Sequence, residues 1–93
     1  MILVTIKQQK NQELMLKAIG TLQSMSETST TPRNIRKLIK DTIFNLQNDS
    51  SSIGARAANA ISMLDELSQD PNIPSFSRVT IWSAVSTLEA IRD

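Results

Sequence analysis

Four basic residues within eight positions are the part of this sequence best suited to binding chemistry. Arg33, Arg36, Lys37 and Lys40 follow the i, i+3, i+4, i+7 spacing that places side chains on one face of a helix. No acidic residue stands between Arg33 and Lys40, so the stripe keeps its positive charge. Such a stripe would attract phosphates or an acidic protein segment, although the same pattern is more often an ordinary solvated helix face.

Two aromatic residues are the other candidates. Phe44 is expected on the same side as Lys37 and Lys40, away from the apolar stripe of its helix, where only a partner would cover it. Trp82 is expected at the border of a later apolar stripe, where a Trp more often closes the edge of a core than anchors an interface. The candidate partner-binding residues are therefore Arg33, Arg36, Lys37, Lys40, Phe44 and Trp82.

The usual parts of an enzyme active site are missing from this sequence. It has no Cys and no His, which removes thiolate and imidazole chemistry and the common zinc sites. The carboxylates of Asp65 and Glu66 point about 100° apart on a helix, so they do not form a facing pair. We expect no catalytic residue, no metal site and no cofactor. An enzyme would need a carboxylate site completed across an oligomer.

Length and composition indicate one small globular domain. The chain has 93 residues, a net charge of +1 and 40% apolar residues, a balance that gives no global attraction to nucleic acid or membrane. No apolar run reaches the roughly 18 to 20 residues needed to cross a bilayer. Met1 to Ile6 is apolar but has neither the long apolar core nor the cleavage site of a signal peptide. The expected location is the cytoplasm.

Apolar residues recur at helical spacing in four segments, and the pattern repeats at an offset of 42 residues. The expected helices cover about residues 11–27, 32–48, 52–69 and 74–92. A period near 40 residues is typical of stacked helical hairpins. The predicted fold is all-α, a four-helix bundle made of two αα-hairpin (HEAT-like) repeats. The matching pairs include Ala18 and Ala60, Leu22 and Leu64, Pro32 and Pro74, and Arg36 and Arg78.

The expected boundaries are an N-terminal arm at residues 1–10 and one helical domain at 11–93, with repeats at 11–49 and 53–93. Thr31 is expected to cap the second helix, with Pro32 in its first position. Leu38 is assigned to the buried stripe of that helix. Arg36 and Arg78 are expected to be structural, with Asp65 or Asp70 as ion-pair partners.

Several short segments resemble the uncharacterised archaeal protein family UPF0147. The resemblance covers about residues 14–92, with the Met1 to Ile6 arm outside it, and implies an all-helical archaeal protein of unassigned activity. Thr28 and Thr31 stand where relatives tend to carry an acidic residue and Val, which implies a less tightly capped first turn. The segments are Pro32 to Arg36, Arg56 to Ile61 with Leu64 to Glu66, Asp70 to Pro74, Ile81 with Trp82, and Leu88 with Glu89.

These features favour a non-catalytic protein-interaction or scaffold module. Two repeats are fewer than the three or more of an independent solenoid, so we expect either a closed bundle or self-association, with a homodimer favoured. Phe44 and the small side chains of Ala55, Ala58 and Ser62 are the expected places for a second copy. The alternative is a nucleic-acid-associated protein that uses the basic stripe, and no membrane partner is expected.

Overall fold

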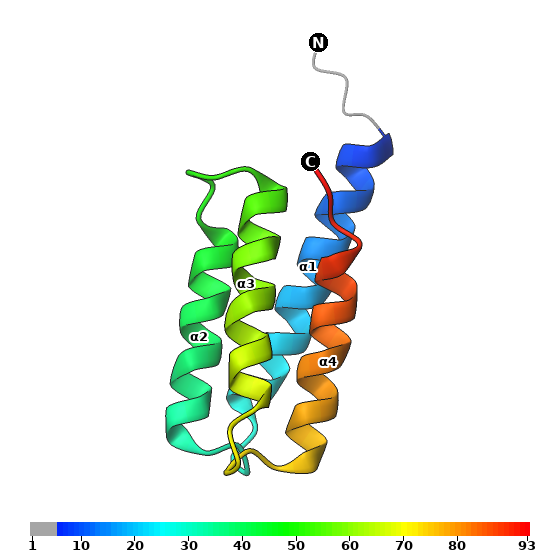
Figure 1. Ribbon diagram of the computed structural model, residues 1–93. Helices are drawn as coiled ribbons and strands as arrows, with labels where there is room; N and C mark the ends of the chain where they lie inside the picture. The colour runs from blue at the N-terminus through cyan, green and yellow to red at the C-terminus, as the bar shows by residue number, and fades with distance from the viewer. Residues whose placement is uncertain (1–5) are drawn as a thin grey trace.

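The computed structural model describes residues 6–93 and is all-helical, with no strand in that range. Its four helices follow one another up and down the long axis of the molecule (Figure 1). None of them combines the length and the apolar character needed to span a bilayer. They are α1 (Ile6–Glu27), α2 (Arg33–Gln47), α3 (Ile53–Ser68) and α4 (Ser75–Glu89).

The helices occupy the four corners of a bundle. α1 packs against α2 and α4, and α3 packs against the same two helices. α2 and α4 therefore lie at diagonally opposite corners, so their outer faces point away from each other. The turns at residues 28–32 and 69–74 are at one end, and the α2–α3 loop and the C-terminus are at the other (Figure 1).

The core is built from aliphatic side chains of all four helices. Leu22, Ile39, Leu64 and Ile81 are fully buried, one from each helix. Their spacing is that of an amphipathic helix with one inward stripe, which is why the sequence predicts these four segments. All three aromatic residues of the chain, two Phe and one Trp, are exposed. The fold therefore buries no aromatic ring.

Two expectations about individual positions differ from the structure. Leu38 is not in the buried stripe: 44% of its surface is exposed, because it faces sideways from α2 towards α3. α1 begins at Ile6, so residues 6–10 of the expected arm are helical. Lys and Gln are good helix formers and extend the helix although residues 6–10 are all exposed. The remainder of the arm, residues 1–5, lies outside the described residues.

The two turns that precede α2 and α4 share one geometry. Pro32 and Pro74 are N-cap residues with ψ of 147° in both cases, and each carbonyl accepts the first helical hydrogen bond at 2.9 and 3.0 Å. The expected N-cap at Thr31 is wrong. The Thr31 hydroxyl is buried and donates to the carbonyl oxygen of Met25 at 3.2 Å, so it fixes the turn to the end of α1. Neither helix has a side-chain cap.

The C-terminal residues close the opposite end of the bundle. The carboxylate of Asp93 accepts hydrogen bonds from the Gly54 backbone N–H and the Ser52 hydroxyl, both at 2.8 Å. The hydroxyl of Ser52, the N-cap residue of α3, also accepts from the Ala55 N–H. The Gly54 and Ser52 bonds, with the nearby charge of Lys7, lower the pKa of Asp93. These contacts attach the end of the chain to the start of α3.

Replacing Gly20 with alanine is expected to raise the free energy of unfolding by about 0.5 to 1 kcal/mol, because alanine is the better helix former. Gly20 is exposed on α1, and an added Cβ would meet nothing within 4 Å. At Gly54 the added Cβ would lie 2.6 Å from the Asp93 carboxyl carbon. Gly54→Ala should therefore gain less. Denaturant unfolding measures both, and equal gains would contradict the Asp93 contact.

Candidate functional site

The basic stripe predicted from the sequence lies on the outer face of α2. Arg33, Arg36, Lys37 and Lys40 line one shallow depression, together with Asn34. The helix brings them together because residues three and four positions apart project from the same side. Arg33, Lys37 and Lys40 are exposed, and Arg36 is partly buried at the edge of the core.

The bundle does not neutralise these charges. No side chain within residues 6–93 forms an ion pair with any of the four residues. The Nε atom of Arg36 is buried and has no hydrogen-bond partner there. The stripe therefore keeps donors and positive charge that an external anionic group can use.

Phe44 adds an apolar contact to the same helix face. It stands one turn after Lys40 and is 69% exposed, as expected from its position outside the apolar stripe. A large apolar side chain beside unpaired basic residues is the usual composition of a surface that binds an amphipathic acidic segment. Arg33, Lys37, Lys40 and Phe44 form what we call the α2 face.

Trp82 does not belong to the α2 face. It lies on α4, at the diagonally opposite corner of the bundle, so one flat partner cannot cover Trp82 and the basic stripe together. It is 56% exposed, which is more than the edge of a core normally shows. The structure therefore separates the candidate residues into two surfaces.

Two further apolar residues on α4 were not selected from the sequence. Phe76 and Val79 are 79% and 63% exposed and lie within two turns of Trp82. The available signal was their absence from the apolar stripe of Ile81, Ala84 and Leu88. We call the exposed residues Phe76, Val79 and Trp82 the α4 face.

The other arginines of the helices stabilise turns. Arg78 Nε donates to the Ser68 carbonyl at the end of α3 at 2.9 Å, and Arg56 Nη1 donates to the Leu46 carbonyl at the end of α2 at 2.9 Å. The structural role expected for Arg78 is confirmed, but its partner is a backbone carbonyl and not Asp65 or Asp70. Charged donors near a helix C-terminus satisfy carbonyls that have no partner within the helix.

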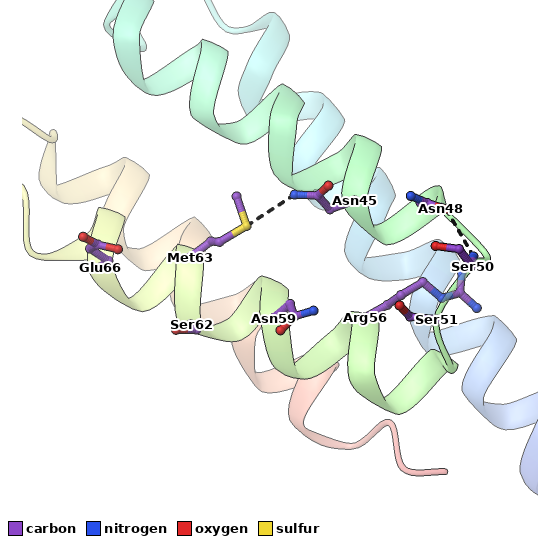
Figure 2. A pocket seen from close by; sticks show the side chains of 9 residues that line it. All are labelled: Asn45, Asn48, Ser50, Ser51, Arg56, Asn59, Ser62, Met63 and Glu66. Atoms are coloured by element: carbon purple, nitrogen blue, oxygen red, sulfur yellow. Dashed lines mark hydrogen bonds between the residues drawn. The ribbon is translucent and has the colours of Figure 1, made fainter.

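A polar pocket of about 440 Å³ lies between α2 and α3 (Figure 2). Amides and hydroxyls dominate its lining, with Arg56 towards one end and Glu66 at the other. The Asn45 amide donates to the Met63 sulfur across the middle at 3.6 Å. The described lining contains no nucleophile beside a base, so its chemistry is that of hydrogen bonding to polar groups.

Comparison with known proteins relates the chain to one family over nearly its whole length. Residues 3–91 match the model of the uncharacterised protein family UPF0147, which extends further into the N-terminal segment than the resemblance implied. A UPF0147 protein from Metallosphaera sedula is 51% identical over 83 residues, which cover 89% of this chain and 93% of that protein. A relative from Thermoplasma volcanium is 36% identical over 87% of this chain and 91% of its own.

Two crystal structures share the fold. A protein of the same family from Thermoplasma acidophilum matches with a TM-score of 0.84 and 33% identity, over 90% of this chain and 99% of that one. The protein MMP1188, described as of unknown function, matches with a TM-score of 0.82 and 31% identity over the full length of both chains. The bundle described above is therefore similar to crystallographic structures.

Proposed function

This chain belongs to the uncharacterised protein family UPF0147, and we propose that it is a non-catalytic interaction module whose α2 face binds an acidic segment of another protein. The observation that carries the proposal is the group of basic side chains that line one depression without ion-pair partners among residues 6–93. A scaffold of four packed helices holds this face rigidly. Binding to it loses little backbone entropy on the side of the module.

The composition of the α2 face supports a protein partner. Phe44 supplies an apolar anchor, and burying its exposed ring would add to the charge contacts. A partner helix with Asp or Glu residues and a large apolar side chain on one face matches both features.

Nucleic acid fits the α2 face less well. The four basic residues span about 10 Å along the helix, which is a small contact beside a duplex. A duplex would also leave Phe44 without an apolar partner. Neutralising about four phosphates would give log affinity a slope near −3 to −4 against log salt concentration. This slope distinguishes the two partner classes.

The proposal predicts that the Lys37→Glu/Lys40→Glu double variant binds an acidic peptide at least about tenfold more weakly, because like charges then face each other. The probe is a short fluorescent peptide with Glu and Leu at helical spacing, followed by anisotropy. The matched control is Lys10→Glu/Lys17→Glu. It changes the net charge equally at exposed positions of α1 and should leave the affinity unchanged.

Three outcomes would contradict the proposal. Equal weakening in both double variants would mean that only the overall charge matters. Tighter binding of a DNA duplex than of the peptide, with the steep salt dependence given above, would favour the nucleic-acid alternative. Absence of binding to either probe would remove the α2 face as a binding site.

We also propose that the two helical hairpins are copies of one repeat. Contacts related by 42 residues support this proposal. The Ser26 hydroxyl donates to the Gln23 carbonyl at 2.8 Å, and the Ser68 hydroxyl donates to the Asp65 carbonyl at 2.7 Å. Likewise, the turn bond from the Thr31 N–H to the Thr28 carbonyl corresponds to that from Ile73 to Asp70, at 3.1 and 3.2 Å. The second copy would then cover the apolar face that one hairpin cannot bury alone.

A further inference from the structure

The α4 face is apolar and almost free of charge. Phe76, Val79 and Trp82 are its exposed large side chains, and α4 has only two charged residues, Arg78 and Glu89. Arg78 Nε donates to the Ser68 carbonyl, so its side chain turns towards α3 rather than outward. The outer surface of α4 from Val79 to Thr87 therefore has no charge.

Large and small residues are separated along this face. Residues seven positions apart lie in one row on a helix, because seven residues make nearly two turns. One row contains Phe76, Ser83 and Ala90, and the next contains Val79 and Ser86, all exposed. In both rows the large side chain is in the first half of the helix and small ones follow it.

We propose that the α4 face is a self-association surface, on which α4 packs antiparallel against α4 of a second copy with Trp82 near the two-fold axis. In that arrangement the first half of one helix meets the second half of the other. Phe76 then packs near Ala90 of the second copy, and Val79 packs near its Ser86. Because the two-fold axis repeats each contact, one helix is complementary to itself.

The charges at the helix ends are complementary in the same arrangement. Antiparallel overlap brings Glu89 of one copy to the start of α4 of the other. That helix start has no side-chain cap and no acidic residue in its first turn, so its N–H groups can receive a carboxylate. A second copy is also a better occupant here than for the α2 face, where two basic stripes would repel each other.

The size of the contact sets the expected strength. One helix per copy buries less than the roughly 800 Å² per partner of a standard interface, so a reversible dimer in the micromolar range is expected. The proposal goes beyond the proposed function and does not depend on it, because the α2 face is at the opposite corner.

The test is sedimentation equilibrium over micromolar concentrations, with emission of the chain's single Trp as a second readout. The intact chain should dimerise, and Trp82 emission should shift to shorter wavelength as the ring leaves water. Val79→Glu should be monomeric at the same concentrations with its helical circular dichroism unchanged. It should still bind the acidic peptide, which separates this proposal from the proposed function. The matched control, Ala58→Glu on the exposed surface of α3, should still dimerise.

A monomer mass at all concentrations would overturn the proposal. A dimer that Ala58→Glu or Phe44→Glu disrupts while Val79→Glu does not would move the interface away from α4. Orientation is tested with single cysteines, since the chain has none of its own. A Ser83→Cys chain should link to its copy through a short bismaleimide. An Ala90→Cys chain should not, because antiparallel pairing places the two copies of residue 90 about 24 Å apart along the helix; efficient linking there would exclude this arrangement.

Discussion

Replacing Leu64 with alanine is expected to lower the free energy of unfolding by about 2 to 5 kcal/mol, and replacing Leu22 should cost a similar amount. Both side chains are fully buried and lie at equivalent positions of the two hairpins. The loss combines the removed apolar burial with the cavity that remains, because the surrounding side chains relax only partly. Urea unfolding followed by circular dichroism measures both changes.

Leu38 provides the matched control for these two variants. It is also a helical leucine, but 44% of its surface is exposed, so Leu38→Ala leaves no closed cavity and should cost less than about 1 kcal/mol. A cost for Leu38→Ala equal to that for Leu64→Ala would mean that Leu38 is buried in solution. A neutral Leu64→Ala or Leu22→Ala would contradict the assigned core.

The second large effect is expected at Arg78. Arg78→Met keeps a long apolar side chain but removes the donor to the Ser68 carbonyl, and it should cost about 1.5 to 3 kcal/mol, as for other hydrogen bonds from charged groups. Arg36, 42 residues earlier, differs: its buried Nε has no partner among residues 6–93. Arg36→Met removes a donor that gains nothing from burial, so stability should change by less than about 0.5 kcal/mol or rise slightly.

Comparison of the two arginine variants by urea unfolding is therefore informative about the repeat. Losses of equal size would show that Arg36 donates to a carbonyl in solution as Arg78 does. A Lys at position 78 is a useful third variant, because it keeps the charge but lacks the Nε–H group. It should recover only part of the stability.

The helices and most of the core were predictable from the sequence. Leu22, Ile39, Leu64 and Ile81 recur at helical spacing, and a face formed by such residues has to be buried whatever the partner. Phe44 was recognised as exposed for the same reason, since it lies outside the stripe. The grouping of Arg33, Arg36, Lys37 and Lys40 was also predictable, because all four lie on one helix and need only its period.

Features that depend on the relation between helices were not predictable. Leu38 fits the apolar period, but its side faces the edge between α2 and α3. The N-cap at Pro32 was misplaced because the buried Thr31 hydroxyl bonds to the end of α1, a contact made across the turn. Trp82 was grouped with the basic stripe because helical periodicity gives the face of each helix and not its corner in the bundle. The apolar group at Phe76 and Val79 was missed because a short apolar helix start looks like a variable core edge.

The diagonal placement of α2 and α4 has a consequence for valency. A dimer paired through α4 would have its two α2 faces on opposite outer sides, farthest from the two-fold axis. The two faces could not share one short acidic helix, but they could bind two acidic segments of a longer or repetitive partner. Once the first segment is bound, the second binds at the effective concentration set by the chain that links the segments, so avidity exceeds the affinity of one face. The bundle would then act as a cross-linker whose strength depends on the spacing of acidic segments in its partner.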